Sequence, residues 1–255
     1  MSAKRYAGLA VAAFMLAACG GTDDLTYQGW VEADLVFVSP DEPGRIETLS
    51  VREGNAVTAG VALFTVDDDL QQADLRQNQA TVTNARQAYE RAQVLLKTNV
   101  GTQKAFEDAE AALRTAEARL NSSQTRLARR RVASPVTGTV QQIYFRPGEM
   151  VPAGRPVVAL LPPANIKLRF FVPEAILPKI ALDESVGVTC DGCPAELTAR
   201  VSFIARSAEF TPPVIYSLEE RTKLVFLVEA RPQRPDVFRV GQPVSISLPA
   251  PGTKR

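Results

Sequence analysis

Two segments of the chain repeat one pattern of apolar residues, polar residues and glycines. The stretch "VREGNAVTAG", residues 51–60, returns 94 residues later as "FRPGEMVPAG", residues 145–154. Apolar and polar positions alternate between the glycines, which predicts short strands joined by tight turns in each copy. The positions that match at this offset include Gly44 and Gly138, Ile46 and Val140, Arg52 and Arg146, Gly54 and Gly148, Val57 and Val151, and Gly60 and Gly154.

Neither copy is large enough to bury its own apolar face. Two such copies can pair face to face as a small β-sandwich, provided that the chain between them leaves and returns at one point. We therefore expect residues 39–67 and 132–162 to form one split domain. The alternative is a pair of unrelated glycine-rich hairpins.

The segment between the copies, residues 68–131, is predicted to be a helical hairpin. It has no proline and one glycine, Gly101, near which we expect the chain to fold back. Large apolar residues recur every seven positions, and smaller residues lie between them. The large positions are Leu75, Val82, Tyr89, Leu96, Phe106, Leu113, Leu120 and Leu127, and the small ones are Asn78, Ala85, Ala92, Ala109, Ala116 and Ser123.

These two heptad ladders predict an antiparallel coiled coil in which large layers alternate with small ones. The expected layers pair Tyr89 with Leu113 and Leu96 with Phe106. Helices of roughly 27 residues reach about 40 Å at about 1.5 Å per residue. Asp68 with Gln71 is a candidate capping box, and Thr102 is a candidate N-cap of the return helix. The alternative, helices packed on a globular core, would need broader apolar stripes.

Residues 163–248 return to short alternating segments punctuated by proline and glycine. This pattern predicts a β-barrel domain, followed by a tail at residues 249–255. The segments are "IKLRFFV", "LTARVSFIA", "KLVFLVEA" and "QPVSISL". The predicted fold is therefore α+β and elongated: a split β-sandwich, interrupted by a coiled-coil hairpin and followed by a barrel.

Composition disfavours several classes of function. The 255 residues include 29 Lys plus Arg, 28 Asp plus Glu and no His. A balanced charge gives no field to attract nucleic acid, so we expect no nucleic-acid partner. The absence of histidine removes the commonest general base and metal ligand at neutral pH. We expect no enzyme activity, no cofactor and no metal site.

The first residues are predicted to be a targeting segment. Lys4 and Arg5 precede an apolar run that is too short to span a bilayer, and small residues precede Cys19. The ending "LAAC" resembles the bacterial lipoprotein lipobox, which implies removal of residues 1–18 and acylation of Cys19. An ordinary secretory signal with an incidental cysteine is the alternative. We expect residues 19–38 to form a tether and a membrane-proximal strand at about Tyr27 to Val38.

Cys190 and Cys193 carry a rival signal, because Cys-x-x-Cys can be a redox centre or half of a metal site. The Asp-Gly pair between them is typical of a type I′ hairpin turn. A local structural disulfide in an oxidising compartment is therefore the preferred interpretation. A redox role, a zinc site and two inert thiols are the alternatives.

The two half-motifs resemble the biotinyl/lipoyl carrier fold. A carrier presents a modifiable lysine between its halves, whereas this chain has Asp67-Asp68-Asp69 there, so we do not expect a carrier function.

The stretch "RAQVLLKTNVGTQKAFEDA", residues 91–109, resembles the hairpin tip of HlyD-type periplasmic adaptors, also called membrane fusion proteins. In that family an Arg, a Leu four residues on and a Ser seven further dock a TolC-like outer-membrane channel. The corresponding residues here are Arg91, Leu95 and Thr102, with Thr replacing Ser.

The resemblance implies a periplasmic adaptor that links an inner-membrane exporter to a TolC-like outer-membrane channel. It further implies that the barrel domain, residues 163–248, carries a small membrane-proximal element. A homo-hexameric ring, held to a membrane by its lipid, is also implied, with the inner membrane favoured. Residues 209–226 favour an ABC-type exporter over a proton-driven pump. The alternatives are a membrane-tethered thiol oxidoreductase using Cys190 and Cys193, and a structural coiled-coil protein of the envelope. The exported substrate is not readable from the sequence.

Overall fold

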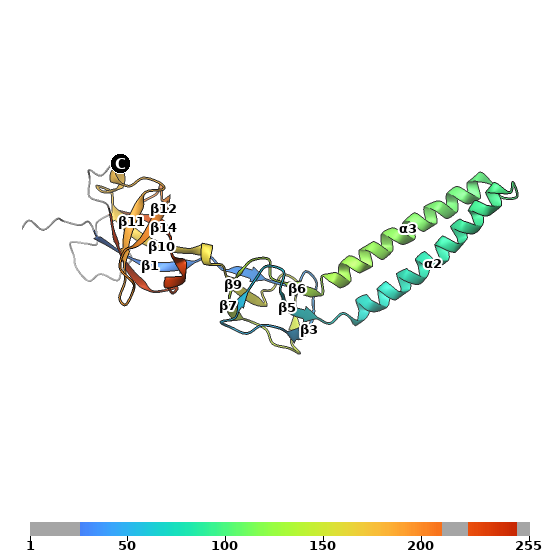
Figure 1. The fold of residues 1–255 in the computed structure, drawn as a ribbon, viewed down its shortest axis with the longest axis horizontal. Helices are drawn as coiled ribbons and strands as arrows, with labels where there is room; N and C mark the ends of the chain where they lie inside the picture. Colours follow the sequence, from blue (N-terminus) through green and yellow to red (C-terminus); the bar gives the residue numbers. More distant parts are fainter. Residues whose placement is uncertain (1–25, 211–223, 249–255) are drawn as a thin grey trace, which may run out of the picture. The chain divides into compact units, whose positions relative to one another are not determined.

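The computed structural model of the protein describes residues 26–210 and 224–248 (Figure 1). The predicted signal peptide, Cys19, most of residues 209–226 and the C-terminal tail lie outside the described residues. The chain divides into two compact units. One unit is Asp34–Asn165, and the other combines the chain before it with the chain after it.

The unit Asp34–Asn165 contains the split sandwich, as predicted. Its two four-stranded sheets have the strand orders β2-β9-β7-β4 and β6-β5-β3-β8. The strands before the helices are β2 (Val36–Val38), β3 (Gly44–Leu49), β4 (Ala56–Val57) and β5 (Ala62–Val66). Those after them are β6 (Arg131–Ala133), β7 (Gly138–Ile143), β8 (Met150–Val151) and β9 (Val158–Leu161). Each sheet thus takes strands from both copies, so neither copy is folded without the other.

The hydrogen bonds between the copies are reciprocal at the same offset of 94 residues. The Gly54 N–H donates to the Val140 carbonyl at 2.8 Å, and the Gly148 N–H donates to the Ile46 carbonyl at 2.8 Å. In the same way the Gly60 N–H donates to Ser134 O at 2.8 Å, and the Gly154 N–H donates to Pro40 O at 3.0 Å. All four glycines have positive φ, a conformation that other residues adopt only at a cost. This explains why the glycines repeat with the apolar pattern.

The sandwich core repeats as well. Its buried side chains are Val38, Ile46, Val51, Val57, Leu63, Phe64, Val66, Val140, Val151, Val157, Val158 and Leu160. Most of them form pairs at the repeat offset, such as Ile46 with Val140 and Phe64 with Val158. Burial of these aliphatic and aromatic groups is the main stabilising term for a domain of this size.

The hairpin consists of α2 (Asp69–Lys97) and α3 (Gln103–Ala128), which run side by side (Figure 1). It starts from β5 and returns into β6, and these two strands pair with each other. The chain therefore leaves and re-enters the sandwich at one place, as the two-copy argument requires. Every predicted seam position is buried or half-buried, with Val82, Ala116 and Ser123 most deeply buried.

One detail of the hairpin differs from the prediction, and one adds to it. The Tyr89 ring lies 5.3 Å from the Phe106 ring, a contact between neighbouring layers of the seam. The capping box at Asp68 is wrong, because the Asp68 side chain caps no backbone N–H and instead accepts from the Gln72 amide at 2.5 Å. An ion pair between Arg86 and Glu117 at 3.0 Å flanks the seam.

The second unit is a closed β-barrel. Six strands are hydrogen-bonded in the order β10-β1-β15-β11-β12-β14, and β14 pairs back with β10. Their bounds are β1 (Thr26–Ala33), β10 (Ile166–Pro173), β11 (Ser185–Thr189), β12 (Leu197–Ile204), β14 (Leu224–Pro232) and β15 (Pro243–Ser247). The short β13 (Glu209–Phe210) extends the sheet beside β14. Closure leaves few backbone groups unpaired at sheet edges.

The N-terminal strand differs from its prediction. A single membrane-proximal strand from Tyr27 to Val38 was expected, but it divides near Asp34. The first part, β1, is a barrel strand paired with β10 and β15, while β2 pairs with β9 in the sandwich. Gly29 makes this packing possible, because a Cβ there would lie 2.9 Å from the Phe170 Cβ and even closer to the Arg169 carbonyl oxygen.

We expect Gly138→Ala to destabilise the sandwich by about 1–3 kcal/mol. A Cβ at this position would lie 2.5 Å from the backbone carbonyl oxygen of Leu161, which cannot move without disturbing β9. The midpoint of thermal unfolding, followed by circular dichroism, measures the effect. The exposed Gln142→Ala on the same strand is the control, expected within about 0.5 kcal/mol of wild type. Equal midpoints for both variants would contradict the close approach.

Candidate interaction site at the hairpin tip

The turn at the tip is built by a helix C-cap that the sequence analysis missed. Asn99 has φ +57°. Its N–H donates to Leu96 O at 3.0 Å, and the Val100 N–H donates to Leu95 O at 2.9 Å. These two hydrogen bonds, with Asn99 in the left-handed conformation at the first position after the helix, define a Schellman motif. After glycine, asparagine is the residue found most often at this left-handed position, so Asn99 could have indicated the end of the first helix.

Thr102 caps the return helix, as predicted. Its hydroxyl oxygen accepts from the Ala105 N–H at 3.1 Å, and its backbone is extended. Since the oxygen is the acceptor in this bond, the hydroxyl proton is free to donate elsewhere. Gly101 lets the turn close, because a Cβ there would lie 3.0 Å from the Leu95 Cβ.

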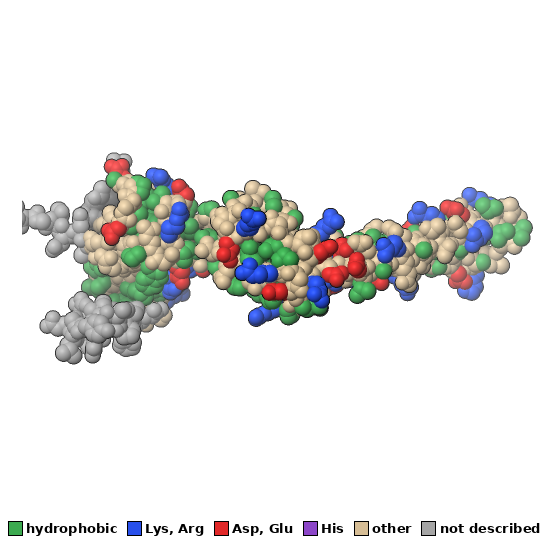
Figure 2. Space-filling model, turned by 90° about the horizontal axis from the view of Figure 1, so that it is seen from below, with side chains coloured by type: hydrophobic (Ala, Val, Ile, Leu, Met, Phe, Trp, Pro, Cys, Tyr) green, Lys and Arg blue, Asp and Glu red, His purple; other side chains and the backbone are tan. Residues whose placement is uncertain are grey.

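Arg91, Leu95 and Thr102 are all exposed. Arg91 and Leu95 lie four residues apart on α2, which places them on one face of the helix. Two further apolar side chains reach solvent here, Val94 at 58% and Val100 at 76% exposure. Figure 2 shows hydrophobic side chains at the free end of the hairpin. Large aliphatic groups left in water at the end of a rod are typical of a contact surface.

The base of the hairpin is held by a buried arginine that the sequence analysis also missed. Arg130, 8% exposed, donates to the Glu42 carboxylate at 2.8 Å and to the Pro43 carbonyl at 3.0 Å. With its amide turned so that the oxygen faces the guanidinium, Gln71 of α2 accepts a bond from Arg130 Nε at 3.0 Å. The Arg130 carbonyl accepts from the Val66 N–H at 2.9 Å. One side chain thus ties both ends of the hairpin to the first copy.

Arg130 lies in a region rich in carboxylates. Figure 2 shows acidic side chains gathered where the hairpin meets the sandwich. The neighbouring Arg129 lies 3.6 Å from the Asp41 carboxylate. A guanidinium can satisfy several acceptors in a fixed geometry, which lysine cannot do.

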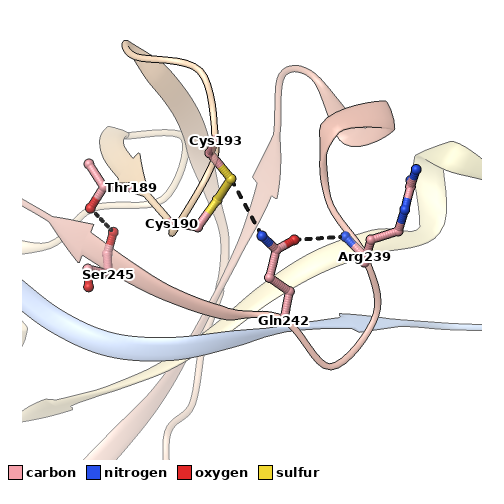
Figure 3. The surroundings of a disulfide bond; sticks show 6 residues. All are labelled: Thr189, Cys190, Cys193, Arg239, Gln242 and Ser245. Atoms are coloured by element: carbon pink, nitrogen blue, oxygen red, sulfur yellow. Dashed lines mark hydrogen bonds between the residues drawn. A yellow bond between two sulfur atoms is a disulfide. The ribbon is translucent and has the colours of Figure 1, made fainter.

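Cys190 and Cys193 form a disulfide in the barrel, with Cα atoms 5.3 Å apart (Figure 3). The Cys193 N–H donates to the Cys190 carbonyl at 3.1 Å, and of the two central residues only Gly192 has positive φ. The expected type I′ turn is therefore wrong, since it requires positive φ at both central residues. Figure 3 also shows the Gln242 amide directed at Cys193 Sγ, at 3.5 Å.

Four charged side chains of the barrel form one connected group of ion pairs. Arg169 binds Glu32 at 2.8 Å and lies 3.6 Å from Glu229, which also binds Lys167 at 3.2 Å. The Arg169 guanidinium lies 5.9 Å from the centre of the Trp30 ring. Burial raises the pKa of the Tyr27 phenol above its usual value, so this group is neutral at physiological pH.

Across residues 26–210 and 224–248, no group of three His, Cys, Asp or Glu side chains is placed to hold a metal ion. In the same part of the chain, no helix combines the length and apolar character needed to span a bilayer.

A split sandwich that carries a helical hairpin and is joined to a barrel is the architecture of a membrane fusion protein, a class of periplasmic adaptors that are typically not enzymes. Residues 34–161, just over half of the chain, match the family described as "RND MFP, barrel-sandwich hybrid domain". The chain belongs to this family, and the expected HlyD-type resemblance is confirmed.

Relatives and solved structures agree with this assignment. A "UPF0194 membrane protein" of Acidithiobacillus ferridurans is 29% identical over 67% of this chain and 61% of its own length. The chain thus spans about three fifths of that relative. A "UPF0194 membrane protein" of Citrobacter koseri is 24% identical over 94% of this chain and 96% of its own length. The crystal structure of a MacA-MexA chimeric protein, containing the Pseudomonas aeruginosa MexA α-hairpin domain, has a TM-score of 0.70 at 18% identity, covering 88% of this chain and 81% of that one.

We expect Thr102→Ala to weaken the first turn of α3 by about 1 kcal/mol, because the Ala105 N–H loses its acceptor. Amide hydrogen exchange at residues 103–106 should speed up by about fivefold. Thr102→Ser keeps a hydroxyl and should exchange at close to the wild-type rate. Unchanged protection in the alanine variant would refute the capping role.

Proposed function

We propose that the protein is the adaptor of a tripartite exporter, linking an inner-membrane transporter to a TolC-like outer-membrane channel. The observation that carries this proposal is the exposed tip, where Arg91, Leu95 and Thr102 face solvent at the end of a two-helix rod. The role of the rod is to reach a partner.

The tip suits a groove between the helices of a partner barrel. Arg91 supplies a guanidinium able to make two parallel hydrogen bonds to a carboxylate. Leu95, 46% exposed, supplies an apolar anchor, and the Thr102 hydroxyl proton supplies a directional donor. The Schellman motif and the Thr102 cap fix the backbone that carries these groups, so little entropy is lost on docking.

The helices set the reach of the adaptor. α2 has 29 residues, which at about 1.5 Å per residue gives a rod of about 44 Å. The seam of the coiled coil and the Arg130 contacts stiffen the rod along its length and at its base. A stiff rod transmits the position of its base to the partner at its tip, which a flexible linker of the same length would not do.

We propose that the inner-membrane partner is an ABC-type exporter. The support is the sequence of residues 209–226, most of which lies outside the described residues. The matched family carries RND in its description, so an RND-type pump is the competing partner. Crosslinking the barrel to its inner-membrane partner and sequencing the product would distinguish them, because only an ABC exporter has a nucleotide-binding subunit.

The adaptor is further proposed to act as a homo-hexameric ring held to the inner membrane by lipid on Cys19. The ring follows from the family resemblance, and the anchor from the lipobox-like "LAAC". Several acyl chains on one residue would anchor the chain stably, whereas a single chain binds only marginally.

We expect Arg91→Asp to abolish export, because it replaces the guanidinium of the docking surface with a like charge for the partner's carboxylates. Export of a reporter substrate from intact cells is the measurement. Arg119→Asp, an exposed arginine on α3 away from the tip, is the matched control and should export normally. Circular dichroism should show the same helix content in both variants.

Wild-type export by Arg91→Asp would refute the docking site. Photocrosslinking from residue 95 separates the adaptor from a purely structural coiled coil. Capture of an outer-membrane channel supports the adaptor, while capture of only a second copy supports a structural protein of the envelope.

The Cys190→Ser, Cys193→Ser double variant distinguishes the adaptor from a thiol oxidoreductase. The disulfide closes a turn of only four residues, so its loss removes little loop entropy, and export should persist at close to the wild-type level. An oxidoreductase would lose its activity completely. The variant is assayed for export beside wild type, with thermal unfolding to verify that the barrel is intact.

A further inference from the structure

A groove lies between the two helices at the base of the hairpin. Its volume is about 430 Å³. It is lined by Asp68, Gln72, Leu75, Gln124, Leu127, Ala128 and Arg131. Neither the docking tip nor the sandwich core uses it.

The walls of this base groove are mostly apolar, with two opposite charges at the rim, Asp68 and Arg131. Leu75, Leu127 and Ala128 supply the apolar wall. The Asp68 carboxylate is engaged by the Gln72 amide at 2.5 Å. Arg131 is exposed and, within residues 26–210 and 224–248, makes no ion pair. The groove therefore suits an apolar side chain accompanied by a carboxylate.

The same hairpin base presents such a pair on its other flank. Leu70, in the first turn of α2, is 78% exposed, the highest value among the large hydrophobic side chains of the described residues. Successive helical residues turn by about 100°, so Leu70 points about 140° away from Leu75 and about 160° away from Gln72. Asp74 lies one turn further along the face of Leu70 and is exposed, and it makes no ion pair within the described part of the chain.

We propose that the base groove receives Leu70 of a second copy of this chain, with Asp74 of that copy paired to Arg131. Leu70 and the base groove lie at the same level of one hairpin but on opposite flanks. The contact is therefore head-to-tail, with Leu70 of one copy in the groove of the next. A row of copies joined in this way has a free Leu70 at one end and a free groove at the other. The row closes into a ring when the rotation between neighbouring copies brings these two ends together. This contact supplies the interface of the ring proposed above and so rests on the proposed function.

A second copy is favoured over a small ligand for two reasons. The groove is open along its length rather than enclosed, and a small molecule would leave Leu70 in water. The contact with a copy covers both features at once, and it matches a free carboxylate with a free guanidinium. The Asp74–Arg131 pair thus attracts the two copies and also fixes how far one hairpin is shifted along the other.

The test is self-association of the full chain in mild detergent, without exporter or channel, followed by sedimentation velocity. Leu70→Asp should raise the dissociation constant by at least about tenfold, because it places a charge in an apolar groove. An acidic residue in the first helical turn is itself favourable, so this variant should fold normally. Leu182→Asp, where the side chain is 61% exposed in the barrel and belongs to no proposed contact surface, is the matched control and should associate like wild type.

A charge exchange tests the register of the contact. Asp74→Arg and Arg131→Asp should each weaken association, and the double variant should restore it to within about threefold of wild type, because every copy then offers the reversed pair. General surface effects would not be rescued in this way.

Three outcomes would overturn the proposal: a wild-type chain that stays monomeric up to about 0.1 mM, unchanged association in Leu70→Asp, or no rescue in the double variant. These outcomes are independent of the outer-membrane channel. If Leu70→Asp associates like wild type while Arg91→Asp loses export, only the proposed interface is refuted. If Leu70→Asp loses association while Arg91→Asp exports normally, only the docking tip is refuted.

Discussion

The structure depends on the mutual closure of two half-domains. Neither copy can satisfy its turn glycines or bury its apolar face without the other, since Gly54 donates to Val140 and Gly148 donates to Ile46. Because β5 and β6 pair side by side, this closure also brings the two ends of the hairpin together. The coiled coil, its Arg130 anchor and the exposed tip all follow from that single requirement.

Much of this arrangement was predictable because it rests on repetition. The 94-residue offset identified the two copies, and the seven-residue spacing identified the seam, whose positions from Leu75 to Leu127 are buried or half-buried as expected. The 94-residue offset and the seven-residue spacing each rest on many residues, so a single deviating residue does not hide either pattern. The barrel was readable for the same reason, since its strands alternate inward and outward positions, as Ile166 to Val172 illustrate.

Single-residue features were less accessible to the sequence. The Asp68 capping box was wrong because Asp68 binds the Gln72 amide, a choice between two local partners that composition does not decide. The role of Arg130 depends on Glu42 and Pro43, which lie 87 to 88 residues away in the chain. The division between β1 and β2 was hidden because no glycine or proline separates Ala33 from Val36, and only three-dimensional pairing distinguishes the two strands. The tip residues were found through a family motif, and their docking role stays a prediction.

The repeat relates the two places where the chain leaves the sandwich. β5, which leads to the helices, corresponds at the 94-residue offset to β9, which leads to the barrel, and the pair Phe64–Val132 corresponds to Val38–Val158. The two places where the chain leaves the sandwich are therefore equivalent strands of a pseudo-symmetric domain. Each of these strands pairs with a strand from the other half, so pulling either one away would break hydrogen bonds between the two halves.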